Sequence, residues 1–354
     1  MQTNFTKEEK KLLDSSVNYM EKCEQGILIN QGPFISSEKP KISVIIPVYN
    51  ASATIKKAIR SIQNQKFQDL EIIIIDDCSP DDSFNIMSEM QKTDPRIKLF
   101  KNEVNRGVLF TRSTAALKAK GKYIMYLDND DMFSRDDIFT ICYDEMEKNE
   151  YDIIEFNGYS THDYHLINQD KKIKSTSPLK EETVIKQPEL SKILLRKISD
   201  EEVEFGFSYL WGKIIKTDII KKSLEMLGEK IEDKVLYHDD DCVNYLLLQN
   251  AKSLKFINIY GIFYYTNQES ITHSKRPIQT CHDILYFFNF INEHSSEEEK
   301  ENLTIRLMNE WDFRITDGLN DENISFAKEV IGKLMKCKLI NEKIKEKVKQ
   351  KCRL

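Results

Sequence analysis

The first third of the chain repeats one pattern: a short apolar run, a polar stop, and then a stretch with helical spacing. The runs are residues 42–46, 71–75, 97–100 and 123–127, and the first two are dense in Ile and Val. Such runs are typical of strands buried on both faces, and their alternation with helices favours a parallel sheet. We therefore predict an α/β fold with a mostly parallel, Rossmann-like sheet flanked by helices.

The segments between the runs support this reading. Ile55, Ile59 and Ile62 share one face of a helix expected over residues 53–64. Pro47 lacks the N–H that a central ladder needs, so we expect the first strand to end there. Another helix is expected from Gly107 onward.

Polar residues collect where these strands end. They are Asn50, Asp76, Asp77, Asn105 and Asp130. The carboxyl ends of parallel strands share one edge of a sheet, and open α/β sheets bind ligands at that edge. This pattern predicts a nucleotide site.

An acidic cluster follows the fourth run, with Asp128, Asp130 and Asp131 around Asn129. Asp is a poor strand former and is rarely buried without a partner. Carboxylates suit hard cations such as Mg²⁺ or Mn²⁺, which take phosphate oxygens as further ligands. The alternative is a solvated acidic turn that caps the next helix.

Together these residues resemble glycosyltransferase family 2. The resemblance rests on four motifs in order, and each is weak alone. They are Pro-Val-Tyr-Asn at 47–50, Ile-Asp-Asp-Cys-Ser at 75–79, Asn-x-Gly-x-x-x-x-Arg at 105–112 and Tyr-Leu-Asp-Asn-Asp-Asp at 126–131. The resemblance implies a GT-A fold, a nucleotide-sugar donor and inversion at the anomeric carbon. Cys78 departs from the family, which usually has Gly there.

The family's roles carry over to matching positions. Nucleotide-sugar binding is implied for Pro47, Tyr49, Asn50, Asp76, Asp77, Arg112, Asp128 and Asn129. Asp77 would accept from the uracil ring N–H, and Arg112 would reach the base or the diphosphate. Asp130 would bind Mn²⁺ or Mg²⁺, with Asp128 at the ribose or beside the metal. The alternative for Arg112 is an ordinary surface arginine.

The second half resembles the family less closely. Trp211 and Lys213 match a Trp-x-Lys segment, which implies an acceptor or diphosphate contact. Asp239 and Asp240 fall on the family's Glu-Asp motif before an apolar helix. Asp240 is our candidate for the base that takes the acceptor's proton, with Asp239 as runner-up. The alternative is an acidic run that only stabilises a helix start.

A Tyr-Tyr…Ser-Ile-Thr segment at 264–272 resembles a family ending, with Thr266 where Arg is usual. His273 follows and could approach the metal or the diphosphate. The alternative is a solvated loop histidine.

Composition narrows the classes of protein. A net charge of −6 over 354 residues disfavours nucleic-acid binding, and no apolar stretch reaches the roughly 20 residues of a membrane span. Seven cysteines without a Cys-x-x-Cys pair, and a start without a signal peptide's apolar core, lead us to expect a cytoplasmic protein. Residues 333–354 carry nine Lys or Arg against two acids, which is +7. This tail could touch a membrane surface or be a solvated end.

We expect three regions. Residues 1–38 form a helical extension and linker, residues 39–275 the GT-A catalytic domain, and residues 276–354 a helical region with the basic tail. Within the catalytic domain, 39–157 binds the donor and 158–275 the acceptor. The resemblance implies metal-assisted transfer of a hexose or N-acetylhexosamine, with UDP-sugar as the expected donor, to a glycan or lipid-linked acceptor. The alternative is an inactive nucleotide-sugar-binding or regulatory protein of the same fold.

Overall fold

The computed structural model describes residues 7–29, 32–163, 174–175, 179, 181–199, 202–228, 231, 235–266 and 277–296, and a few positions after 298. The chain divides into two compact units. The first comprises Met1–Leu190, Leu210–Lys234 and Gln249–Asn267, and the second Ser191–Tyr209, Val235–Leu248 and Gln268–Leu354.

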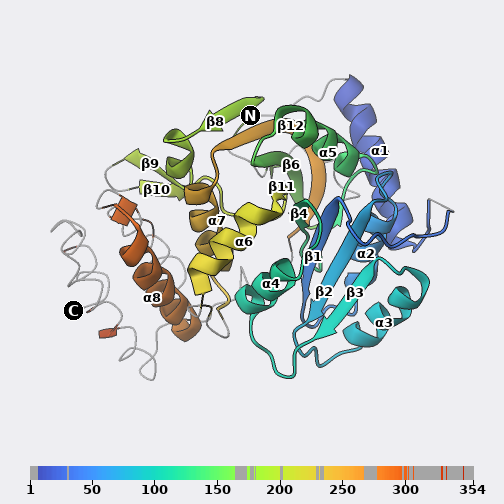
Figure 1. Ribbon diagram of the computed structural model, residues 1–354, viewed down its shortest axis with the longest axis horizontal. Coiled ribbons are helices and arrows are strands. Elements are labelled where there is room, and N and C mark those ends of the chain that lie inside the picture. Colours follow the sequence, from blue (N-terminus) through green and yellow to red (C-terminus); the bar gives the residue numbers. More distant parts are fainter. Residues whose placement is uncertain are drawn as a thin grey trace. The chain divides into compact units, whose positions relative to one another are not determined.

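The first unit is built on one mixed sheet with strand order β3-β2-β1-β4-β11-β6-β12-β5 (Figure 1). Strands β1 to β4 are mutually parallel, as the Ile-rich runs predict. Their bounds are β1 Ile42–Val48, β2 Leu70–Asp76, β3 Ile97–Lys101 and β4 Tyr123–Tyr126. This parallel half confirms the predicted fold class.

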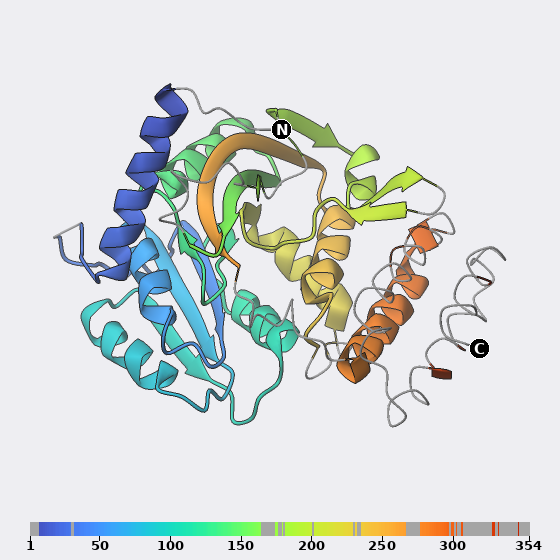
Figure 2. The ribbon, with the colours of Figure 1, turned by 180° about the vertical axis from the view of Figure 1, so that it is seen from behind.

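Beyond β4 the sheet becomes mixed. β11 (Lys213–Lys216) runs antiparallel to β4 and β6 (Ile153–Thr161), while β12 (Ser253–Tyr265) runs parallel to β6. Figure 2 shows the long, curved β12 lying along β6. Short strands complete the sheet: β5 (Met132–Phe133) and β8 (Thr183–Lys186) pair with β12, and β7 (Lys174–Ser175) pairs with β6.

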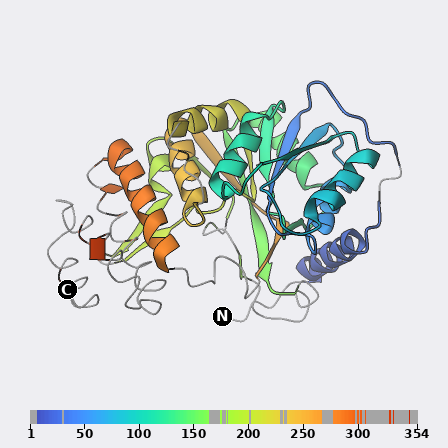
Figure 3. The ribbon, with the colours of Figure 1, turned by 90° about the horizontal axis from the view of Figure 1, so that it is seen from below.

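Helices cover both faces of this sheet. Right-handed crossovers in the order β3-β2-β1-β4 put α2 and α3 on one face and α4 on the other. α2 packs against α3, and α4 against α6 (Figure 3). The bounds are α2 Ile55–Gln63, α3 Ser83–Thr93, α4 Val108–Leu117, α5 Ile138–Asn149 and α6 Thr217–Leu227.

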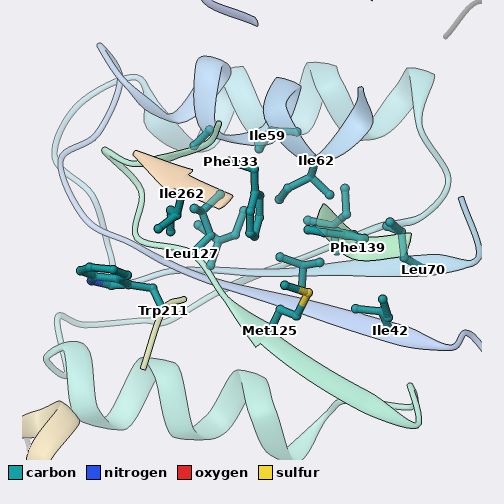
Figure 4. Close-up of a cluster of buried hydrophobic side chains, with 14 of the residues drawn as sticks. Ile42, Ile59, Ile62, Leu70, Met125, Leu127, Phe133, Phe139, Trp211 and Ile262 are labelled. Atoms are coloured by element: carbon teal, nitrogen blue, oxygen red, sulfur yellow. The ribbon is translucent and has the colours of Figure 1, made fainter. Parts of the chain in front are cut away.

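The main core lies between the strands and α2 (Figure 4). Ile59 and Ile62 project from α2 toward Leu127 and Phe133, as their helical spacing predicts. Phe133 and Phe139 meet edge to face, with ring centroids 4.7 Å apart. This packing holds the segment after β4, which carries the acidic cluster, firmly to the sheet.

The expected end of β1 at Pro47 is wrong, because the strand continues to Val48. β1 and β4 pair only as far as Ile45 and Tyr126. Since alternate residues face the same neighbour, Pro47 faces the β4 side beyond the end of that pairing. Its missing N–H therefore costs no ladder hydrogen bond.

The N-terminal extension contains α1 (Lys7–Glu24), matching the helix expected there. Figures 1 and 2 show it beside α2. The buried Tyr19 hydroxyl donates to the carbonyl of Ser61 (2.6 Å) and accepts from the Gln65 amide (3.1 Å). These contacts join the extension to the first unit.

The second unit contains a hairpin, most of α7 and α8. The hairpin pairs β9 (Leu195–Ser199) with β10 (Glu202–Phe205), and the short η2 helix (Glu189–Lys192) precedes it across the boundary. α7 spans Asp239–Asn250 and α8 spans Pro277–His294. Tyr245 of α7 donates its hydroxyl hydrogen to the carbonyl of His294 (3.0 Å), which fastens α7 to α8 within this unit.

Candidate nucleotide-sugar site

The carboxyl edge of β1, β2 and β4 gathers most of the residues that the sequence singles out. Asp77, just past β2, is buried and accepts three hydrogen bonds. Its Oδ1 accepts from the Asn102 amide (2.7 Å) and the Arg106 backbone N–H (2.8 Å), and its Oδ2 from the Gly107 N–H (2.8 Å). A carboxylate offers about four acceptor positions. Asp77 thus fixes the backbone just before α4, and one acceptor position on its Oδ2 remains for another donor.

Two residues at this edge have left-handed backbones. Asn50 has φ 53° and Cys78 has φ 60°. Asparagine tolerates this region, whereas a cysteine there is uncommon. The turn after Asp77 thus forms with Cys78, in a conformation that explains why glycine suits the position.

Asp76 is completely buried at the end of β2. Its Oδ2 accepts from the Ser79 backbone N–H (3.1 Å) and lies 3.9 Å from Nζ of Lys101. Its Oδ1 has no hydrogen-bond partner among the described residues. Asp76 therefore supports the turn that carries Asp77.

The end of β1 is joined to the acidic cluster. The Asn129 amide donates to the carbonyl of Pro47 (3.1 Å). Tyr49 follows with 48% of its surface exposed, so its ring is available for stacking. The structure thus brings Pro47, Tyr49 and Asn129 to one place.

Arg112 is buried on α4 and is not a surface arginine. Its Nη2 donates to Oδ1 of Asp128 at 2.7 Å, and the Asp128 side chain keeps 27% of its surface exposed. A charge-assisted bond of this kind fixes both side chains. It ties α4 to the loop after β4.

Asp130 and Asp131 have disturbed acid–base properties. Burial, and then the Asp128 carboxylate, raises the pKa of Asp130 to about 6. Burial and the neighbouring carboxylates raise the pKa of Asp131 well above its usual range. Asp131 also accepts from the Tyr265 backbone N–H (2.9 Å) through Oδ1, while its buried Oδ2 has no partner among the described residues. The carboxyl groups of Asp130 and Asp131 therefore lie close to other carboxyl groups, with few donors to stabilise their charged forms.

This donor set fits a hard divalent cation. Carboxylate oxygens are its preferred ligands, and Mg²⁺ is commonly held by one or two carboxylates together with substrate phosphates. The part of the chain that the structure describes contains no group of three or more His, Cys, Asp or Glu arranged to hold a metal alone. A cation here would need Asp130 and Asp128 and further oxygens from a bound ligand.

Trp211 and Lys213 are buried in the first unit. Trp211 stacks on Tyr264 with ring centroids 5.3 Å apart and belongs to the main core. Lys213 begins β11 opposite Glu155 of β6. Their predicted acceptor or diphosphate roles stay predictions.

The acidic run before the apolar helix lies in the second unit, and it does begin α7. Asp241 is buried and its Oδ2 lies 2.9 Å from Nδ1 of His238. Asp239 and Asp240 are only partly buried in the first turn. The three carboxylates thus have different surroundings, and the base role stays a prediction. His273 and the basic tail at 333–354 lie outside the described residues, apart from position 346 in the tail.

Asn102 was missed by the sequence reasoning. It follows β3, and its amide donates to both Asp77 and the Thr111 hydroxyl (3.1 Å). The rule that polar residues at strand ends line the edge would have found it. Asp131 was noticed without a role, because only the fold shows its bond to Tyr265.

Comparison with solved structures identifies the class of fold. The chain aligns with the crystal structure of Staphylococcus aureus TarS 1-349 with a TM-score of 0.59, covering 86% of this chain and 82% of that one at 16% identity. That similarity shows the shared architecture, and the chain has a GT-A-like α/β fold.

Residues 43–195 match the family model described as Glycosyl transferase family 2. A 93-residue alignment with the GalNAc(5)-diNAcBac-PP-undecaprenol beta-1,3-glucosyltransferase of Campylobacter jejuni is 44% identical and covers 26% of this chain and 30% of that relative. The uncharacterized glycosyltransferase EpsJ of Bacillus subtilis is 27% identical over 66% of this chain and 63% of its own. The chain thus spans less than two thirds of either relative. Among the described residues, no helix combines the length and apolar character needed to cross a bilayer.

Proposed function

We propose that this protein transfers a sugar from a UDP-sugar to a hydroxyl group of a glycan or lipid-linked acceptor, with inversion at the anomeric carbon. The observation that carries the proposal is the group of side chains that the structure brings together at the carboxyl edge of the sheet. Asp77 with a spare acceptor position, the exposed ring of Tyr49 and the Arg112–Asp128 pair all stand at the ends of β1, β2 and β4 or on α4. These are the parts that a base, a ribose and a diphosphate require.

Within this proposal, Asp77 accepts from the uracil imide N–H and Tyr49 stacks on the ring. Arg112 orients Asp128 toward the ribose. Solved TarS structures of the same fold hold UDP and UDP-GlcNAc, which supports a uridine donor. The name of the Campylobacter jejuni relative contains an undecaprenol-linked glycan, which supports a lipid-linked acceptor for this protein.

Asp130 and Asp128 would hold Mn²⁺ or Mg²⁺. When bound, the cation would neutralise the diphosphate as negative charge develops on it. Asp240 would take the proton of the acceptor hydroxyl, with Asp239 as the alternative base. A hexose or an N-acetylhexosamine is the proposed sugar.

A thermal-shift competition tests the base pocket. Cytosine presents an unprotonated ring nitrogen where uracil has an N–H, so Asp77 would face it unpaired at a cost of about 1–3 kcal/mol. We expect UDP to bind roughly tenfold or more tightly than CDP in the presence of Mn²⁺. The same assay with UDP-glucose, UDP-GlcNAc and UDP-GalNAc ranks the donors. Equal affinity for UDP and CDP would remove Asp77 from base recognition.

A further inference from the structure

The segment that precedes the acidic run is held by one carboxylate on α8. Asp283 is completely buried. Its Oδ2 accepts from two consecutive backbone N–H groups, those of Leu236 and Tyr237, both at 2.9 Å. Two bonds to adjacent amides fix the direction of the backbone at that point, because neither peptide plane can rotate without losing one.

The other oxygen of Asp283 is also occupied. The Gln279 amide donates to Oδ1 at 2.7 Å, and Nδ1 of His282 lies 2.9 Å from it. Both residues belong to α8. A buried carboxylate is stable only when it is well hydrogen-bonded, and Asp283 satisfies this with four close donors or ring nitrogens. Its side chain is therefore held rigidly from its own helix.

A second contact with α8 lies one turn further along the helix. The ring of His238 stacks on Phe287, with centroids 5.3 Å apart and planes within 2°. The same imidazole contacts Oδ2 of Asp241 through Nδ1 at 2.9 Å. The N–H of Cys242 donates to the His238 carbonyl (3.0 Å), which makes His238 the residue from which α7 starts.

Residues 236–238 are thus attached to α8 at two levels, immediately before Asp239 and Asp240. His238 has a left-handed backbone (φ 62°), which an isolated chain rarely adopts. Such a conformation persists when the surroundings determine it. Here the surroundings are the Asp283 carboxylate and the Phe287 ring.

We infer that Asp283 is a positioning residue for transfer: from α8 it fixes residues 236–238 and so sets the direction in which the first turn of α7 presents the Asp239 and Asp240 carboxylates to the acceptor. This inference rests on the proposed base role of that pair. Asp283 itself touches no reacting group. It lies beyond residues 43–195, so the family model does not include it.

The test compares Asp283→Asn with Glu71→Gln. Asn keeps the size of Asp283 but replaces one acceptor oxygen with an NH₂ group. Glu71 is a matched control because it too is buried and accepts two hydrogen bonds through one oxygen. Its Oε1 accepts from the Ser43 hydroxyl (2.6 Å) and the Lys120 N–H (2.7 Å), at the end of β2 opposite Asp77. Both variants should lose stability. The readouts are kcat for transfer, Kd for UDP with Mn²⁺, and hydrogen exchange at the Leu236 and Tyr237 amides.

We expect Asp283→Asn to lower kcat by about tenfold or more, to leave the Kd for UDP within about twofold, and to speed exchange at both amides. Glu71→Gln should keep kcat within about twofold and leave those amides protected. A wild-type kcat in Asp283→Asn despite faster exchange would overturn the inference. An equal loss of kcat in both variants would also overturn it, since the effect would then be one of general stability.

Two further variants keep the result interpretable. Asp239→Asn and Asp240→Asn report on the proposed function: if neither lowers kcat, the base assignment has failed, whereas a loss there without a loss in Asp283→Asn means that the positioning role has failed. If Asp283→Asn does not fold, Gln279→Met removes only the amide that steadies Oδ1. It should lower kcat about threefold, and an unchanged kcat would overturn the inference.

Discussion

At the residue scale, the buried carboxylates of the first unit divide into two kinds. Asp77 accepts hydrogen bonds from three donors, two of them backbone N–H groups. Asp131 is buried and Asp130 is partly buried near other carboxylates, and Lys57 is the cation that opposes the shift in both pKa values. A buried carboxylate with enough donors is a stable structural group. A carboxylate that is buried with few donors favours the binding of a proton or a cation.

The raised pKa of Asp130 has a consequence for stability. Its pKa moves from an ordinary 3.8 to about 6 on folding, so between these pH values the folded state keeps a proton that the unfolded state loses. The free energy of unfolding therefore falls as pH rises through this window. Asp130→Asn removes the penalty and should raise stability at pH 7.5 without metal, by on the order of 1–3 kcal/mol.

Thermal melts in EDTA at pH 7.5 and pH 3.5 would measure this effect. The gain in Tm should be present at pH 7.5 and nearly vanish at pH 3.5, where Asp130 is mostly protonated in both states. Asp218→Asn, which removes an exposed carboxylate from the first turn of α6, is the control and should change Tm little. A variant that is less stable than the wild type at pH 7.5 would contradict the argument. With Mn²⁺ and UDP the order should reverse, because the wild type has the full set of proposed metal ligands and gains more from binding.

At the element scale, α1 is a packed part of the first unit. Leu13, Tyr19, Met20 and Cys23 are buried in a small core with residues of β5, β6 and β12. Burial raises the pKa of the Cys23 thiol to about 11, so this cysteine stays a neutral packing group near pH 7. The N-terminal extension thus packs against the segment after β4 through Met132 of this small core.

Tyr19→Phe tests this attachment. The change keeps the ring but removes the hydroxyl that bonds Ser61 and Gln65. Losing such a buried group costs about 1–2 kcal/mol, which should lower Tm by roughly 1–3 °C in a chain of this size. Tyr143→Phe is the control, because the Tyr143 ring packs on Phe67 and no hydrogen bond of its hydroxyl is seen among the described residues. Equal melting of Tyr19→Phe and wild type would show that this hydroxyl adds little to the attachment of α1.

At the scale of the whole molecule, the proposed donor-binding residues and the proposed base belong to different units. Asp77, Arg112 and Asp128 lie in the first unit, and Asp239 and Asp240 in the second. Each group is organised by contacts inside its own unit, through α4 in one case and α8 in the other. Donor binding and transfer should therefore respond separately to mutation.

Asp240→Asn separates the two steps. The amide keeps the size and hydrogen-bonding capacity of the carboxylate but cannot take a proton near neutral pH. We expect transfer to slow by about 10²–10⁴-fold, while the Kd for UDP with Mn²⁺ and the Tm change little, since Asp240 is only partly buried in the first turn of α7. Steady-state kinetics and calorimetry would measure both. If Asp239→Asn loses activity and Asp240→Asn does not, Asp239 is the base.

Much of the first unit follows from the sequence alone. The apolar runs predict β1 to β4, because strands buried on both faces must be continuously apolar, and the helical spacing between the runs predicts the helices that alternate with them. The same logic places Asp77 and Asp130 at one edge. Pro47 was misjudged because the local rule cannot tell which neighbour a strand residue faces.

Contacts between residues far apart in the chain were decided only by the tertiary structure. The sequence shows three similar aspartates at 239–241, and the fold distinguishes them by burying Asp241 against His238. It also pairs Arg112 with Asp128 and brings Asp283 to the amides of Leu236 and Tyr237, 46 or more positions away. Spacing along a chain encodes strands and helices, whose contacts are local or periodic. The surroundings of a carboxylate depend on which distant donors the packing delivers, and no local pattern records that.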